Sequence, residues 1–385
     1  MNAPLYGKII AQLLENLASG KLKAGERLPT EQELADTYGV SRITSKRALD
    51  MLTRAGVIQR SRGRGSFVVK TLPNLDEVRR ELNLTDVRVE HGAREAIGLI
   101  LPDFSEVFGL AIVYAVEEAC AKLGYHLILR RTYGEQKLEE EAIRTLKEFG
   151  VSGLIVFPVH GEHYNPALLR AVLGNFPVVL IDRYLSGIRT PSVVVDNDKA
   201  AQALTDYLLK LGHREIAFIS PPIERTSTLE QRLSGFHTAL SRHGLRPNPA
   251  HSLNNLYSSL PTHFKPLDIL YDQETIKTFL QGVPEVTAFV VVEYNLALAL
   301  TQTLLSLGKN VPEDYSIVCF DSPEIPLEVP RFTHVRQDQT GIGEKAVEVV
   351  QALIEGKSPL LHHVLSFEFI EGRSTKSVKG LEVNA

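Results

Sequence analysis

The spacing of hydrophobic positions divides the chain into two regions of different structure. Near the N-terminus, apolar residues recur every three or four positions from Tyr6 to Leu17, and the run ends at Gly20. This period is typical of an amphipathic helix that packs one face against a core. Between residues 95 and 376, short apolar runs such as Ile97–Leu101 alternate with helical patterns. That alternation predicts an α/β region with parallel sheets covered on both faces.

The N-terminal region continues with signals for two further helices joined by a tight turn. Thr30 and Glu33 fit a capping box, in which a hydroxyl and a carboxylate satisfy the free amides at a helix start. The turn falls at Gly39-Val40, and Ser41 can cap a third helix that runs to about Ala55. The sequence therefore predicts a helix-turn-helix.

A hairpin follows, and its tip is rich in arginine and glycine. Val57-Ile58 and Phe67-Val68 are the apolar arms around residues 60–65.

The charge of the chain is unevenly distributed. Residues 1–70 hold 12 basic and 6 acidic residues, a net charge of +6, and the remainder has a net charge of −10, which gives the total of −4. A positively charged region favours a polyanionic partner. We expect the basic head, an α+β winged helix, to contact double-stranded DNA.

Residues 5–69 resemble the winged-helix DNA-binding domain of the GntR family. The resemblance is carried by Gly25-Glu-Arg-Leu-Pro-Thr-Glu31, Gly39-Val-Ser-Arg-Ile-Thr-Ser-Lys-Arg47 and Gly63-Arg-Gly-Ser-Phe-Val68, in that order. It implies operator DNA as a partner, with Ile43 in place of the more usual polar residue. The expected DNA-binding residues are Gln32, Ser41, Arg42, Ile43, Thr44, Lys46, Arg47, Arg62, Gly63 and Arg64.

We expect the winged-helix domain to cover residues 1–70 and a linker to cover 71–94. Leu75, Val78 and Leu82 could line one short helix there. Either this linker becomes rigid when the head binds DNA, or it only tethers the head to the next domain. A ligand-binding domain is expected over 95–376, with a tail at 377–385. The pattern in residues 247–275 is irregular and predicts no particular element.

In the α/β region, polar and aromatic side chains follow the predicted strands. Ligands in parallel α/β folds bind outside the carboxyl ends of strands, so these residues are candidates for a binding cleft. An aspartate in this position can instead cap the following helix, and this alternative stays open for each one taken singly. The residues are Asp103, Phe104, Phe108, Asp182, Arg183, Asp196 and Asp321, with Arg232 on a helix after another strand.

Residues 96–372 resemble the LacI/GalR effector domain. Among the motifs that carry the resemblance are Leu180-Ile-Asp-Arg183, Gln231-Arg-Leu-Ser-Gly-Phe236 and Val335-Arg-Gln-Asp338. It implies the type I periplasmic-binding-protein fold, with two lobes crossed by three strands. We expect the lobes to be interleaved, one over about 95–196 plus 322–338 and the other over 197–321 plus 339–376.

The same resemblance implies that Asp182, Asp196, Arg232 and Asp321 hold effector-contact positions, together with Phe104 and Gln337. One position departs from the family pattern, because Glu293-Tyr294 stands where Asn-Asp is usual. Glu293 is therefore a candidate for changing which effector is accepted. A GntR-type head on a LacI/GalR-type body is the arrangement of arabinose-repressor-type regulators.

These features predict a ligand-responsive transcription regulator of the bacterial cytoplasm, specifically a repressor of carbohydrate-use genes. A sugar or sugar-like effector in the cleft between the lobes would change operator affinity. One winged helix buries little surface on DNA, so we expect a homodimer that places two heads on two half-sites. The sequence leaves open a co-repressed regulator or an activator.

Other classes of protein are less compatible with the sequence. No apolar run approaches the length of a membrane span. The first residues include Lys8 and Glu15 and lack an apolar core with a small-residue cleavage site, so we do not expect them to act as a signal peptide. An enzyme with a regulatory head would need a motif such as a Schiff-base lysine, a metal-ligand cluster or a phosphate loop. We find none of these motifs in the sequence. We therefore expect no catalytic residues, no metal and no cofactor apart from the effector. Cys120 and Cys319 are expected to be buried free thiols.

Overall fold

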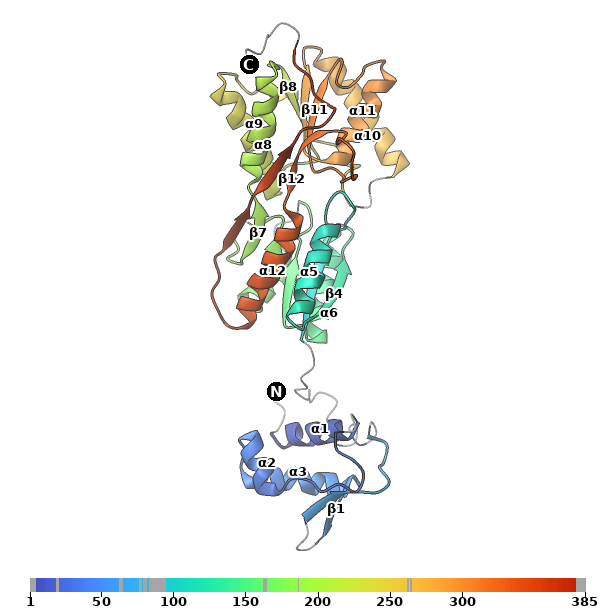
Figure 1. Ribbon diagram of the computed structural model, residues 1–385, viewed down its shortest axis with the longest axis vertical. Helices are drawn as coiled ribbons and strands as arrows, with labels where there is room; N and C mark the ends of the chain where they lie inside the picture. Colours follow the sequence, from blue (N-terminus) through green and yellow to red (C-terminus); the bar gives the residue numbers. More distant parts are fainter. Residues whose placement is uncertain are drawn as a thin grey trace. The chain divides into compact units, whose positions relative to one another are not determined.

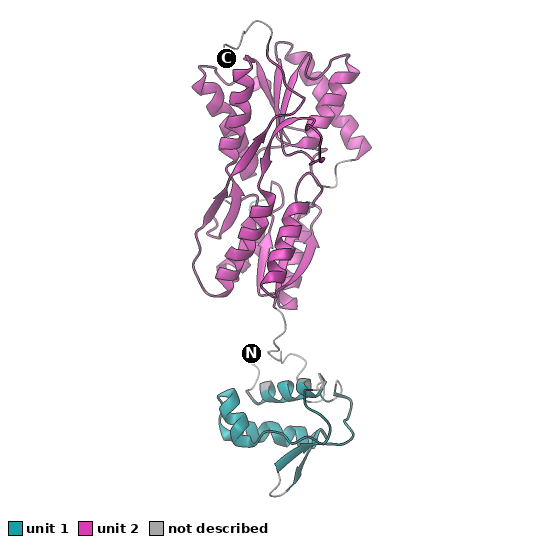
Figure 2. Ribbon diagram, viewed as in Figure 1, with its two compact units in different colours: residues 1–93 teal, residues 94–385 magenta. Residues whose placement is uncertain are grey.

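The computed structural model describes residues 5–18, 21–61, 65–75, 78, 82, 95–161, 165–185, 187–261, 263 and 265–378. The chain divides into two compact units, residues 1–93 and residues 94–385 (Figure 2). The predicted residues Arg62, Gly63 and Arg64 lie outside the described residues, as does most of the expected linker.

Within its described residues, the first unit contains helices α1, α2 and α3 and a hairpin (Figure 1). Helices α1 and α2 both pack on α3, around a core that includes Leu14, Leu49 and Leu52. The two strands pair antiparallel, with Ile58 opposite Val68. This is the predicted winged helix. Its elements are α1 (Leu5–Ala18), α2 (Glu31–Tyr38), α3 (Arg42–Arg54), β1 (Ile58–Ser61) and β2 (Gly65–Val68).

The head extends beyond residue 70, where we expected it to end. Val78 is only 3% exposed within the head's core, and Leu72, Leu75 and Leu82 pack against the same cluster. These four side chains remove apolar surface from water, which ties the segment to the head. The expected boundary at residue 70 is therefore too early.

The start of α2 and the turn between α2 and α3 are built as their residues predict. Thr30 accepts a hydrogen bond from the backbone N–H of Glu33 at 3.2 Å, and the carboxylate of Glu33 accepts one from the N–H of Thr30 at 2.7 Å. Gly39 ends α2 in the left-handed region, at φ 60°. Ser41 then caps α3 by accepting from the N–H of Thr44 at 3.2 Å.

Replacing Gly39 by alanine is expected to lower the free energy of unfolding of the head by about 1 kcal/mol, because a Cβ disfavours positive φ. Nothing lies within 4 Å of that Cβ, so the cost is conformational and not steric. Thermal denaturation measures the loss. Gly39→Asn is the control and should cost less, because asparagine tolerates this conformation. Equal losses in the two variants would contradict the explanation.

Two six-stranded sheets form the second unit, one in each lobe. The N lobe has the strand order β13-β7-β6-β5-β3-β4, and all its strands are parallel. Helices α5 and α12 pack together and α6 packs with α7. The elements are β3 (Ala96–Leu101), α5 (Leu110–Lys122), β4 (His126–Arg131), α6 (Gln136–Phe149), β5 (Gly153–Val156), α7 (Pro166–Leu173), β6 (Val178–Ile181), β7 (Ser192–Val195), α12 (Gln339–Ile354) and β13 (His362–Leu365).

The C lobe has the strand order β14-β12-β11-β10-β8-β9, in which only the β12–β14 pair is antiparallel among the described pairings. Helices α8 and α9 pack against each other, as do α10 and α11, with the sheet between the pairs (Figure 1). The elements are α8 (Asn197–Lys210), β8 (Ile216–Ile219), α9 (Ser227–Arg242), η1 (Pro249–His251), β9 (Ser252–Leu253), α10 (Pro266–Gly282), β10 (Ala288–Val291), α11 (Tyr294–Ser306), β11 (Ser316–Phe320), β12 (Thr333–Gln337) and β14 (Phe367–Ile370).

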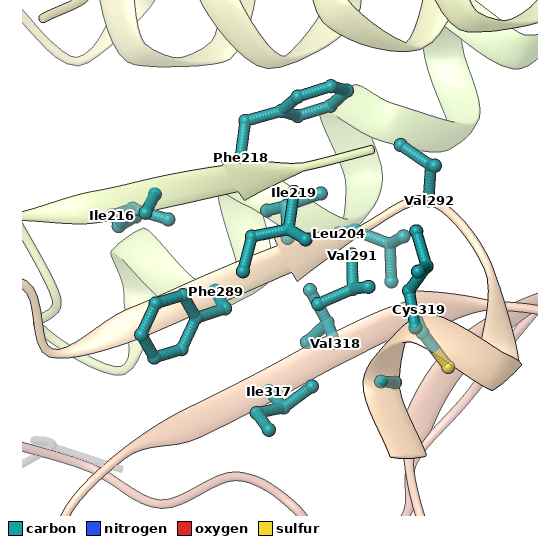
Figure 3. Close-up of a cluster of buried hydrophobic side chains, with 14 of the residues drawn as sticks. Leu204, Ile216, Phe218, Ile219, Phe289, Val291, Val292, Ile317, Val318 and Cys319 are labelled. Carbon is teal, nitrogen blue, oxygen red and sulfur yellow. The ribbon is translucent and has the colours of Figure 1, made fainter. Parts of the chain in front are cut away.

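The central strands of the C lobe carry its core. Figure 3 shows Phe218, Phe289, Val291 and Val318 from β8, β10 and β11 among the buried side chains, and each is 0% exposed. Cys319 belongs to this cluster and Cys120 to the core of the N lobe, and both are free thiols, as predicted. Near-continuous apolar strands are expected where helices cover both faces of a sheet.

The chain passes between the lobes after β7, after β12 and after β13. Our assignment of the C-terminal segments to lobes was wrong for β12, α12 and β13, and right for β14, which pairs with β12 in the C lobe. We placed 322–338 in the first lobe, but β12 pairs with β11 in the C lobe. We placed 339–376 in the second lobe, but α12 packs on β5 and β6 of the N lobe. Apolar periodicity identifies these elements, whereas their lobe depends on pairing partners that are distant in sequence.

Candidate effector cavity and DNA-contacting face

A cavity of about 350 Å³ lies between the lobes, beside the carboxyl ends of the parallel strands. This volume suits a small ligand. The N lobe contributes residues after β3 and β6, and the C lobe contributes residues of α9 and the ends of β10, β11 and β12. Nine of the ten predicted effector residues line it: Asp103, Phe104, Phe108, Asp182, Arg183, Arg232, Glu293, Asp321 and Gln337.

Arg232 on α9 is held firmly in the cavity wall. Its side chain is almost completely buried, and its Nε donates to Oδ1 of Asn197 at 2.8 Å. One Nη donates to the carbonyl oxygen of Val292 at 2.8 Å, and the guanidinium lies over the ring of Phe320, 3.9 Å from its centroid. Two hydrogen bonds and a stacked ring fix the orientation of this cation.

Three carboxyl groups share this part of the cavity with Arg232. Burial lowers the pKa of the Arg232 guanidinium, while Asp182, Asp321 and Glu293 act in the opposite direction. Burial raises the pKa of Asp321 to about 6 and also raises the pKa of Glu293. Near neutral pH such groups can accept hydrogen bonds and, when protonated, also donate them. Together with a guanidinium, they suit vicinal hydroxyl groups.

Asp182 and Asp321 are placed by an unusual backbone conformation. Each follows the last residue of a strand, and their φ values are 67° and 56°. Positive φ is uncommon for residues other than glycine and is often found at functional sites. Asp321 is further held by Gln337, whose backbone N–H and Nε2 donate to its carboxylate at 3.1 and 2.6 Å.

Aromatic side chains form the N-lobe wall. The rings of Phe108 and Phe157 meet edge to face, with centroids 6.1 Å apart. Arg183 lies over Phe157 at 4.9 Å, and its Nε donates to Asp182 at 3.2 Å. Aromatic faces suit the C–H side of a sugar ring. Sequence reasoning missed Phe157, because its apolar side chain continues the buried strand β5 and is predicted as part of that strand.

At the cavity margin, Asp103 pairs with Arg131 at 2.8 Å, and both side chains are partly exposed. The guanidinium of Arg131 also lies 5.7 Å from the ring centroid of Phe104 and 4.5 Å from that of Tyr133. Asp103 therefore has a partner within the N lobe in addition to its place in the cavity wall.

His160 is a second lining residue that sequence reasoning missed. Burial lowers its pKa to about 4, with Arg183 acting in the same direction, so the ring is neutral at pH 7. Its Nδ1 lies 3.3 Å from the hydroxyl of Thr226. Neither Nε2 of His160 nor one Nη of Arg183 has a hydrogen-bond partner within the described part of the chain, although both atoms are buried. Buried polar atoms in this state favour a ligand or water as partner.

Asp196 is not in the cavity, and here the expected contact is wrong. Its carboxylate caps α8 by accepting from the N–H of Lys199 at 3.0 Å, and it pairs with the Lys199 ammonium at 2.8 Å. This is the helix-capping alternative that a strand-end aspartate always allows. The neighbouring Asn197, buried at 1% exposure, holds Arg232 instead.

In the head, the first turns of α3 present a polar and basic face. Arg42, Ile43, Lys46 and Arg47 are exposed, with Ile43 at 81%, whereas Thr44 is half-buried and Ser41 is used as the cap. Arg42 lies 3.4 Å from Glu31 in an exposed pair. On α2, Gln32 is exposed and donates to Asp36 at 2.8 Å.

Arg47 differs from its neighbours because its guanidinium stacks on Tyr6 of α1, 4.3 Å from the ring centroid. Arg60 at the hairpin pairs with Asp50 at 2.9 Å. These internal contacts orient two cations next to the α3 face.

A two-lobed α/β domain with a polar cavity, joined to a winged-helix head, defines a ligand-binding regulator of the DNA-binding class. Residues 5–68 match the family model for bacterial regulatory proteins of the gntR family, and residues 205–375 match that for a periplasmic binding protein-like domain. The arabinose metabolism transcriptional repressor of Geobacillus stearothermophilus is 30% identical over 92% of each chain. The chain therefore belongs to the family of transcription regulators that join a GntR head to a LacI/GalR-type effector domain.

Solved structures agree with this fold. A CelR–cellobiose complex matches with a TM-score of 0.62 at 20% identity, covering 90% of this chain and 100% of that one. A LacI family transcriptional regulator from Enterococcus faecium with bound ribose matches with a TM-score of 0.60 at 22% identity, covering 74% of this chain and 100% of that one. No helix in the described ranges is long and apolar enough to cross a membrane.

Proposed function

We propose that this chain represses carbohydrate-use genes and that a sugar in the cavity between its lobes changes its affinity for operator DNA. The main support is the lining of the cavity. Arg232, Asp321 and Gln337 offer charged and polar groups on one side, and the rings of Phe108 and Phe157 lie on the other. That combination suits the hydroxyl groups and C–H faces of a sugar. The arabinose repressor relative and the two sugar-bound structures support this reading.

The proposal is tested with the purified full-length chain and three sugars, arabinose, ribose and cellobiose. A sugar that binds the folded state raises its melting temperature, because it stabilises that state by RT ln(1 + c/Kd), where c is the free sugar concentration. The same sugar should change the affinity for a DNA fragment selected by the protein itself. Release of DNA identifies an inducer, and tighter binding identifies a co-repressor. No thermal shift with any sugar and DNA affinity independent of all three would refute the proposal.

We further propose that a homodimer presents two heads to two half-sites. Gln32, Arg42, Ile43, Thr44 and Lys46 on the α2–α3 face are the proposed DNA contacts, with Ser41 and Arg47 beside them. Arg62, Gly63 and Arg64 are the proposed contacts of the hairpin tip. Paired half-sites spaced by whole helical turns are expected for such an arrangement.

Arg42→Ala is expected to weaken operator binding by about 1–3 kcal/mol if the side chain reads a base edge. Its guanidinium is exposed and pairs only loosely with Glu31 among the described contacts, so it is free to turn toward DNA. Fluorescence anisotropy with a labelled operator measures the change. Arg54→Ala, an exposed arginine in the last turn of the same helix, is the matched control. Equal effects of the two substitutions would point to overall charge and not to base recognition.

A further inference from the structure

One wall of the cavity comes from the irregular stretch to which the sequence assigned no element. This wall consists of Ser259, Leu260 and Pro261, which lie between β9 and α10 along the chain of the C lobe. The backbone N–H of Leu260 donates to the carbonyl of Tyr257 at 2.9 Å, which closes a tight turn. Residues 256–261 are called the strap below.

Asp272 on α10 anchors the beginning of the strap. Its side chain is 0% exposed. Its two carboxylate oxygens accept from the N–H of Tyr257 at 3.1 and 3.0 Å, and one of them accepts from the N–H of Ser258 at 2.7 Å. Hydrogen bonds from backbone N–H groups to a carboxylate are among the strong ones, so this buried acid fixes the strap to the C lobe.

The far end of the strap touches the N lobe. A Cβ placed on Gly134 would lie 3.2 Å from Cβ and 3.4 Å from Cγ of Pro261. Gly134 follows β4 and has φ 77°, next to Tyr133 with φ 55°. The strap is thus fixed to one lobe, lines the cavity, and meets the other lobe at a glycine that permits close approach.

We infer that the strap is a clasp on the effector cavity, closed by the contact between Pro261 and Gly134, and that Asp272 is its positioning residue. The inference deepens the proposed function, because it concerns access of a sugar to that same cavity. The contact closes one side of the cavity, so a ligand held between the lobes leaves faster when it opens. Asp272 acts through the backbone of Tyr257 and Ser258 and does not touch the ligand.

A disulfide across the clasp tests the contact. The double variant Gly134→Cys/Pro261→Cys places two Cβ atoms near the separation of about 3.5–4.5 Å that a disulfide requires. Cys120 and Cys319 are buried, so the new pair reacts selectively. Full-length protein loaded with radiolabelled arabinose and then oxidised should release it at least about tenfold more slowly than the reduced protein, a difference of about 1.4 kcal/mol. Reduction should restore release.

The matched control pair is Gly124→Cys/Pro261→Cys, because nothing lies within 4 Å of a Cβ on Gly124. This pair should not cross-link. Failure of the Gly134 pair to cross-link, or equal release before and after its oxidation, overturns the clasp. If ribose or cellobiose is the sugar that shifts the melting temperature, it replaces arabinose as the probe.

The anchor is tested with Asp272→Asn, which keeps one acceptor oxygen and turns an amide N–H toward the strap backbone. In the full-length protein without sugar, hydrogen exchange of the Tyr257 and Ser258 amides should quicken about tenfold. Exchange in β8 and α9 should stay unchanged, which separates a positioning role from general destabilisation. Release of the bound sugar should quicken by a similar factor.

Asp268→Asn, one turn earlier on α10, is the control and should change neither rate. Unchanged exchange at Tyr257 and Ser258 in Asp272→Asn overturns the anchor, and faster exchange throughout the C lobe overturns the positioning role. If none of the three sugars binds the wild-type protein, the proposed function fails, while cross-linking and exchange still decide whether the clasp exists.

Discussion

Arg232→Ala is expected to abolish the effect of sugar on operator binding while leaving operator binding itself intact. The substitution removes the guanidinium group that lines the cavity and is held by hydrogen bonds to Asn197 and Val292. It also leaves the carboxyl groups of Asp182, Asp321 and Glu293 without their shared partner. Removing one member of a buried charged group costs about 3–5 kcal/mol of stability. Anisotropy titrations with and without sugar, together with thermal denaturation, measure both consequences.

Two further variants separate charge from geometry. Arg232→Lys keeps the cation but loses the planar guanidinium that meets Asn197 and Phe320, so it should restore most of the stability and little of the sugar response. Arg242→Ala removes an exposed arginine of the same helix, paired with Asp206, and should affect neither property. Normal sugar-dependent release from Arg232→Ala would exclude this residue from the effector site.

The parts of the site that could be predicted from the sequence are those in which topology alone determines position. The carboxyl ends of the parallel strands of one sheet meet at one edge, which places Asp182 at the edge of the N-lobe sheet and Asp321 at the edge of the C-lobe sheet. That these two edges face each other follows from the two-lobed fold that the family resemblance implied. Residues far from strand ends have no such rule. His160 and the strap residues reach the cavity through loops whose course is set by contacts such as those of Asp272.

Asp196 and Asn197 show why adjacent polar residues cannot be assigned from residue type. Both follow β7, and both can cap a helix or face a ligand. The structure uses Asp196 as the cap of α8, and Asn197 is turned inward to Arg232. Which of the two points inward depends on the exact residue at which the helix starts, and residue type alone does not determine that residue.

The crossing segment after β12 joins the cavity to the rest of the N lobe. Gln337 holds Asp321 in the cavity, and Asp338 caps α12 by accepting from the N–H of Gly341 at 2.8 Å. Gln339 then accepts from the N–H of Gly109 at 2.8 Å and donates to the carbonyl of Val107 at 3.0 Å. A sugar that competes for Asp321 therefore acts on a segment bonded to both lobes. For sugar binding to change the arrangement of the lobes, the two arrangements must bind the sugar with different affinities.

Asp321→Asn is expected to stabilise the protein at neutral pH and to remove its response to sugar. The folded-state pKa of Asp321 is about 6, above its ordinary value of 3.8, because burial disfavours the charged form. A raised pKa favours folding most below pH 4, and this contribution is lost as pH rises through 6. A shift of roughly 2 units corresponds to about 3 kcal/mol. The asparagine variant avoids that loss while its carbonyl oxygen can still accept from Gln337.

The melting temperatures of wild type and Asp321→Asn should therefore be nearly equal at pH 4 and should diverge between pH 4 and pH 6, with the variant higher. Asp314→Asn, a more exposed acid of the same lobe, is the control and should show no such divergence. Should the wild type instead gain stability relative to Asp321→Asn as pH rises, the charged carboxylate would be favourable in the cavity. The cation of Arg232 would then outweigh the cost of burial, and the pKa of Asp321 would have to lie below its ordinary value.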